Sequence, residues 1–118
     1  MIRALVQRDG VIGIVPFNAF LVPGWDRRRG DPKDAASVST IVRAIDYVCQ
    51  QAGDAQHAGL GTDFDGGFGS ESIPDGLDTV ADLAKVAEGL REAGYSSPDV
   101  EAVMGGNWLR ILNSALPA

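Results

Sequence analysis

Several residue types that would define a class of protein are scarce in this 118-residue chain. It has one cysteine, Cys49, which excludes an internal disulfide, and one histidine, His57, which cannot build a zinc site without further histidines or cysteines. Acidic residues outnumber basic ones by 16 to 10, and the net charge of −6 argues against nucleic-acid binding. No apolar run approaches the ~20 residues that span a membrane.

The remaining composition is that of an ordinary globular protein. Hydrophobic residues make up 45% and charged residues 22% of a chain long enough for one small domain. The N-terminal stretch is too polar, and its apolar segment too short, for a signal peptide. We therefore expect a cytoplasmic protein, in which Cys49 acts as a small buried hydrophobe.

A strand, a helix and a second strand are predicted in the first half of the chain. Residues Val11–Val15 form an unbroken apolar run, which indicates a strand buried on both faces, and Pro16 ends it. Residues Ala35–Ala52 carry apolar side chains at helical spacing, with Asp34 or Ser37 as N-cap and Gly53 after the end. The second strand covers residues 57–62. This order predicts a parallel pair with a right-handed crossover.

Further helices are predicted on either side of this unit. Residues 2–8 form a short helix, and Thr79 with Asp82 resembles the capping box of another, which ends near Gly94. Ser97-Pro98 begins a last helix with one apolar face. A second apolar face, made of Leu109, Leu112 and Leu116, predicts that this helix packs on two sides.

The stretch HAGLGTDFDGG, residues 57–67, is the strongest candidate for a functional site. An apolar strand that ends in a carboxylate is how α/β sheets and barrels place a catalytic side chain, which indicates a catalytic role for Asp63. A calcium loop is excluded because the EF-hand glycine and glutamate positions hold Phe68 and Pro74. For Asp65 we favour a structural role, in which its carboxylate caps backbone amides in a turn.

Two other groups of polar residues receive structural interpretations. His57 lies at the start of the second strand, far from Asp63, and is predicted to be structural. The arginines at positions 27–29 could bind an anion, but we favour a solvated loop in which they pair with neighbouring carboxylates, those of Asp26, Asp31 and Asp34. The glycines near Asp63 match no nucleotide-binding motif.

With these motifs in place, the chain resembles the C-terminal part of the membrane dipeptidase family, peptidase family M19. HxGxGxDFDG followed by GNWLR at this distance is a specific combination. The segments that carry the resemblance, in family order, are GVIGIVPFNAFL, STIVRAIDYVCQQAG, HAGLGTDFDGG, GFGSESIPDGLDTVADL and LREAGYSSPDVEAVMGGNWLRIL.

The resemblance implies a metal-dependent hydrolase with a (β/α)8 TIM barrel and two zinc ions that cleaves dipeptides. It implies a proton-transfer role for Asp63 and a place on the substrate side of the rim for Asp65, Gly66 and the loop to Pro74. The family's zinc ligands, and an arginine that contacts substrate, have no counterpart here. We therefore expect residues 1–118 to be a single partial domain, the last β/α units of a barrel, which needs ~250 residues to close.

Two hypotheses follow. In the first, the chain is a C-terminal piece of a zinc dipeptidase, which alone binds no zinc and is inactive, and which needs an N-terminal barrel portion as its partner. In the second, it is a stand-alone, non-enzymatic α/β module that assembles, for example as a homo-oligomer, through its exposed strand edges. Neither hypothesis involves nucleic acid or a membrane.

Overall fold

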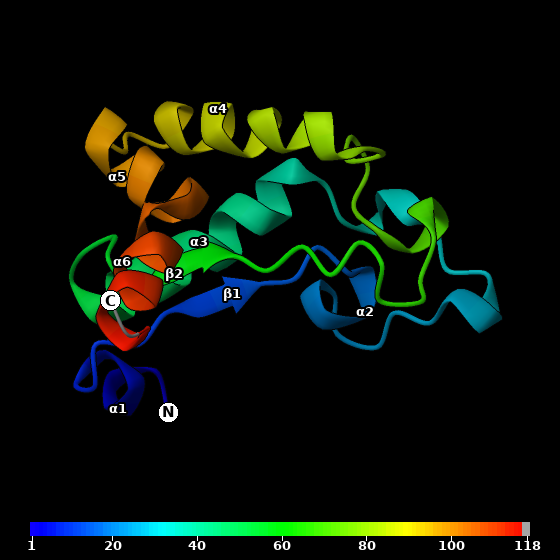
Figure 1. Ribbon diagram of the computed structural model, residues 1–118. Helices are drawn as coiled ribbons and strands as arrows, with labels where there is room; N and C mark the ends of the chain where they lie inside the picture. Colours follow the sequence, from blue (N-terminus) through cyan, green and yellow to red (C-terminus); the bar gives the residue numbers. More distant parts are fainter. Residues whose placement is uncertain (117–118) are drawn as a thin grey trace.

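The computed structural model describes residues 1–116 and has an α/β architecture (Figure 1). Strand β1 (Ile12–Ile14) and strand β2 (Ala58–Leu60) pair in parallel, with Gly13 opposite Gly59. Helix α3 (Val38–Ala52) connects them, which confirms the predicted parallel strand–helix–strand unit. The strands are shorter than predicted, and Pro16 explains the end of β1 because it has no N–H for the ladder.

Helix α3 is the centre of the hydrophobic core. Ser37 and Thr40 form a capping box at its start, and Gly53 ends it in the left-handed conformation, with φ of 89°. Its buried face consists of Ile41, Val42, Ile45, Val48 and Cys49. Burial raises the pKa of the Cys49 thiol, so this residue behaves as the predicted small hydrophobe.

The remaining helices surround this unit. Helix α4 packs on α3 (Figure 1), and the predicted capping box of Thr79 and Asp82 is present in the 3₁₀ turn before α4. Gly94 ends this segment with φ of 95°. The helix bounds are α1 Ile2–Val6, α2 Asn18–Leu21, α4 Ala84–Glu92, α5 Ser97–Glu101 and α6 Asn107–Ala115; 3₁₀ turns cover Arg27–Arg29, Lys33–Ala35, Ser70–Ser72 and Val80–Leu83.

The C-terminal helix differs from the prediction of one continuous helix. It is divided into α5, a π-helical segment (Ala102–Gly106) and α6, with non-helical backbone angles at Gly105. Two consecutive glycines weaken a helix because each loses more backbone entropy on folding than other residues do and has no side chain to pack. The break lets α6 take its own direction over β2.

The prediction that this helix packs on two sides is wrong for residues 1–116. Leu109, Leu112 and Leu116 are exposed, because no element within residues 1–116 covers that side of α6. Strand β1 is half-buried rather than buried, whereas Ala58 and Gly59 of β2 are buried as expected. Residues Ile12, Ile14 and Leu60 pack against the core around α3.

No helix within residues 1–116 is long and apolar enough to cross a membrane.

Candidate active site

The candidate site lies at the edge of the sheet where both strands end. Because β1 and β2 are parallel, the segments that follow them emerge on the same side, with α2 beside them (Figure 1). Asp63 lies three residues beyond the end of β2 and its side chain is exposed. The backbone of Gly61 still donates to the Ile14 carbonyl, at 3.1 Å, so the sheet supports the chain almost up to Asp63.

Asp63 has an uncommon backbone conformation. Its φ is 49°, in the left-handed region, and Asp9 is the only other non-glycine residue among residues 1–116 with a positive φ. Gly66 then donates its backbone N–H to the Asp63 carbonyl at 2.9 Å, which closes a four-residue turn. A non-glycine residue in this region is strained, and such residues concentrate at functional sites.

The structure also describes the two other predicted rim residues. Within the described part of the chain, the Asp65 carboxylate accepts no hydrogen bond. The interpretation of Asp65 as a side-chain cap is therefore wrong, because the backbone bond from Gly66 to Asp63 already closes the turn. Gly66 lies directly beside the Asp63 carboxyl group: a β-carbon at residue 66 would lie 2.5 Å from both carboxylate oxygens.

An aromatic cluster joins the two loops at this edge. Phe17, after β1, and Phe68, after β2, stack with ring centroids 4.5 Å apart. Phe20 contacts Phe17 edge-to-face at 5.0 Å, and the Phe20 side chain is exposed. This cluster was not among the predicted features, although the position of an aromatic residue after each strand was the available signal. It adds an apolar surface to an otherwise polar rim.

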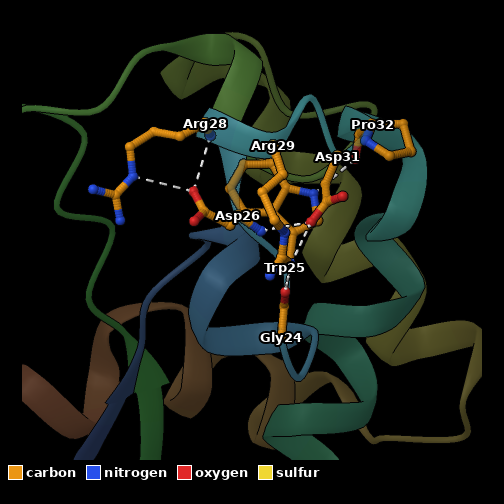
Figure 2. Close-up of polar contacts among 7 residues, drawn as sticks. All are labelled: Gly24, Trp25, Asp26, Arg28, Arg29, Asp31 and Pro32. Carbon is orange, nitrogen blue, oxygen red and sulfur yellow. Dashed lines mark hydrogen bonds and ion pairs between the residues drawn. The ribbon is translucent and has the colours of Figure 1, made fainter.

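The loop of residues 24–32, which we call the arginine loop, is held by polar contacts among its own residues (Figure 2). Arg29 pairs with Asp31 at 2.9 Å, and the Asp26 carboxylate accepts from the Arg28 backbone N–H at 2.9 Å. The Arg29 bond holds the pKa of Asp31 below its usual range, and the Arg28 backbone N–H does the same for the pKa of Asp26.

The predicted pairing of this loop is confirmed for two of its three carboxylates. Asp26 and Asp31 take part, whereas no ion pair involves Asp34 in the described residues. The buried Trp25 anchors the loop, since its Nε1–H donates to the Pro32 carbonyl at 2.9 Å. Arg29 also donates to the Gly24 carbonyl.

His57 has a structural role at the opposite end of β2, as predicted. The ring is buried, and Nδ1 donates to the Gly10 carbonyl oxygen at 2.8 Å. This bond joins the start of β2 to the turn that precedes β1. His57 therefore helps to hold the two strands in register, away from the edge that carries Asp63.

The GNWLR motif fastens the C-terminal helix to β2. The buried Asn107 amide donates to the carbonyl oxygens of Ala55 and Ala58, at 2.7 and 2.8 Å. Trp108 donates to the Leu60 carbonyl at 2.9 Å and covers the strand face that carries Gly13 and Gly59. Sequence reasoning recognised this motif without identifying these contacts, which position the strand that leads to Asp63.

The residues of this chain do not fit the two zinc ions that the resemblance implies. Within residues 1–116, no group of three or more His, Cys, Asp or Glu side chains is placed to hold a metal ion. Asp63 and His57 are at opposite ends of β2, and the Nδ1 of His57 is engaged by the backbone of Gly10.

The parallel strand–helix–strand unit is an α/β fragment that carries a carboxylate at the end of its second strand, and comparison with known proteins identifies its family. The model of the membrane dipeptidase family, peptidase family M19, matches residues 1–116. The chain belongs to this family.

Curated relatives are considerably longer than this chain. An uncharacterized protein from the pqqA 5′ region of Klebsiella pneumoniae is 36% identical over 113 residues, which are 96% of this chain and 38% of that protein. The dipeptidase aclJ of Aspergillus oryzae is 33% identical over 95% of this chain and 24% of its own length.

Solved structures show the same fold over a similar share of their length. An amidohydrolase from Pseudomonas aeruginosa matches with a TM-score of 0.75 and 26% identity, over 95% of this chain and 38% of that protein. A metallopeptidase from Rhodobacter sphaeroides, bound to a phosphinate mimic of the dipeptide L-Ala-D-Ala, matches with a TM-score of 0.76 and 23% identity, over 98% of this chain and 30% of that one.

Proposed function

We propose that residues 1–118 form one part of a dipeptidase barrel, to which they contribute the last β/α units and the proton-transfer residue Asp63. The observation that carries the proposal is the position of Asp63, at the carboxyl edge of a parallel strand and in a left-handed backbone conformation. Catalytic residues of β/α barrels lie at this edge. The chain's membership of the dipeptidase family supports a peptide bond as the target.

Asp63 would move a proton during hydrolysis. A water oxygen bonds to the peptide carbonyl carbon while the C–N bond breaks, so a proton must leave the water and the departing amine must gain one. The Asp63 carboxylate accepts the proton from the water and delivers it to the amine nitrogen, which returns the side chain to its charged form. Asp65 and Gly66 would border the substrate on the same rim.

The zinc ions of the intact enzyme would be held by residues outside this chain, in an N-terminal portion of the barrel. The support is the absence of a suitable ligand cluster within residues 1–116. We propose that this chain alone binds no zinc and is inactive, and that the assembled enzyme works in the cytoplasm, where a free thiol such as Cys49 stays reduced.

A fusion protein tests this function. Residues 1–118 would replace the matching C-terminal segment of the Rhodobacter sphaeroides metallopeptidase, and L-Ala-D-Ala hydrolysis would be measured, because that protein binds a mimic of this dipeptide. We expect activity in the fusion and none in the isolated chain. A fusion that folds with the thermal stability of its parent but hydrolyses no dipeptide would contradict the proposal.

The alternative is a stand-alone, non-enzymatic α/β module that assembles through its exposed strand edges, and a second exposed surface favours assembly. The apolar side chains of Leu109, Leu112 and Leu116 are exposed along one side of α6, and exposed apolar patches mark interaction sites. Light scattering distinguishes the two: a stable homo-oligomer that dissociates after Leu109→Glu, together with an inactive fusion, would favour the module.

A further inference from the structure

The turn after β2 contains two consecutive glycines, Gly66 and Gly67. The structure gives a different reason for the absence of a side chain at each position. Gly67 has φ of 86°, and a β-carbon there would meet nothing within 4 Å. Its glycine is therefore explained by the backbone angle. Gly66 differs from Gly67 in both respects. Its φ lies outside the left-handed region, and other atoms occupy the space that a β-carbon would need.

The atoms that occupy this space belong to one side chain. A β-carbon on Gly66 would lie 2.5 Å from Cγ, Oδ1 and Oδ2 of Asp63, which is well inside van der Waals contact. The backbone bond of 2.9 Å between Gly66 and Asp63 holds the two residues together. The carboxyl group of Asp63 thus rests against the bare α-carbon of Gly66.

We propose that Gly66 is a positioning residue for Asp63, and that its missing side chain sets the direction of the Asp63 carboxyl group. The catalytic meaning of this inference rests on the proposed function. The clash in a Gly66→Ala variant involves a short, rotatable side chain on an exposed turn, so the carboxyl group can rotate away while the fold persists. The variant would therefore keep its stability and lose the geometry of its proton-transfer group.

The pair Gly66→Ala and Gly67→Ala tests this directly in the 118-residue chain. NMR three-bond couplings to Cγ report the χ1 rotamer of Asp63, and thermal unfolding reports stability. We expect Gly66→Ala to change the Asp63 rotamer with little change in melting temperature. Gly67→Ala should do the reverse, because it places a β-carbon on a left-handed backbone but in open space.

The same two variants in the dipeptidase fusion provide the functional readout. Gly66→Ala should lower kcat by about 10²-fold, the loss expected for a misplacement near 1 Å, with KM little changed. Gly67→Ala should lower the kcat of the folded fraction much less than Gly66→Ala does, because its β-carbon would lie in open space and away from the Asp63 carboxyl group. Gly66→Ala should also cause no further loss in an Asp63→Asn background, because both changes remove the same group.

The outcomes separate this inference from the proposed function. If Gly66→Ala leaves the Asp63 rotamer unchanged, or leaves kcat unchanged in an active fusion, the positioning role is refuted. If the unaltered fusion folds but is inactive, the proposed function fails, while the NMR comparison still decides whether Gly66 directs the Asp63 side chain.

Discussion

The indole Nε1–H of Trp108 donates a hydrogen bond of 2.9 Å to the carbonyl oxygen of Leu60, the last residue of β2. The same ring lies against Gly59 and Gly13, which face each other across the strand pair. This arrangement couples α6 to the strand that leads to Asp63. It also explains the glycines at position 13 of β1 and position 59 of β2, because the indole of Trp108 occupies the space their side chains would need.

Gly59→Ala should therefore destabilise the chain. Its β-carbon would lie 2.7 Å from Nε1 of Trp108, so the indole must move and the bond to Leu60 is strained or lost. Overpacking of this kind costs about 1–3 kcal/mol. Urea unfolding measures the loss, and Gly61→Ala is the matched control because its β-carbon would make ordinary contacts of 3.4 Å or more. Equal stability of the two variants would contradict this description of the Trp108 contact.

Asp63→Gly should have the opposite effect on stability. A left-handed backbone is unfavourable for aspartate and not for glycine, and single residues in such regions cost on the order of 1 kcal/mol or more. Removing this strain should raise the free energy of unfolding, but part of the increase is offset because glycine makes the unfolded chain more flexible. We expect a small increase in the urea midpoint together with loss of activity in the fusion. A clear decrease in stability would show that the Asp63 side chain makes stabilising contacts absent from this structure.

The start of α4 should lose stability in acid. The Lys85 ammonium, with the backbone and hydroxyl of Thr79, holds the pKa of the Asp82 carboxyl far below its usual range. Because the pKa of Asp82 is lower in the folded state, its charge stabilises the fold at pH values above the unfolded-state pKa, which is near 3.9 for aspartate. This contribution is lost progressively as the pH falls below that value and towards the folded-state pKa.

Asp82→Asn separates this contribution from those of other carboxylates. The variant should be less stable than the native chain at pH 7, and the difference should shrink as the pH is lowered from about 5 towards 2. Urea midpoints across this range provide the measurement. A difference that stays constant with pH would show that the Asp82 charge does not contribute.

The isolated chain should hold no zinc stoichiometrically. The structure brings no cluster of three or more ligand side chains together within residues 1–116. Elemental analysis after dialysis against zinc-containing and then zinc-free buffer gives the measurement. One or more tightly held zinc ions per chain, released by Asp63→Ala, would overturn this prediction.

Local sequence signals predicted the parts of the fold that depend on local physics. The apolar periodicity of residues 38–52, the capping residue Ser37 and the terminating Gly53 defined α3, and Thr79 with Asp82 defined the start of the next helical segment. These signals suffice because helix ends are determined by neighbouring residues.

Three features differ from the predictions, and two of them are local details that the apolar pattern and the residue types alone did not resolve. The apolar pattern after Pro98 suggested one helix, but two adjacent glycines interrupt it at Gly105. Leu109 and Leu112 were expected to be packed and are exposed, because burial depends on which elements are present to cover them. Asp65 was expected to cap the turn, but the turn is closed by backbone atoms of Asp63 and Gly66.

The choice between Asp63 and Asp65 as the proton-transfer residue is the central claim, and turnover of L-Ala-D-Ala by the fusion protein tests it most directly. Asp63→Asn keeps the size of the side chain and tolerates the left-handed backbone, but the amide cannot take a proton. We predict that it lowers kcat by about 10²-fold or more, as general acid–base catalysis usually contributes 10²–10⁴-fold, while Asp65→Asn lowers kcat much less. Full activity of Asp63→Asn, or an inactive Asp65→Asn variant that is still folded, would contradict the account.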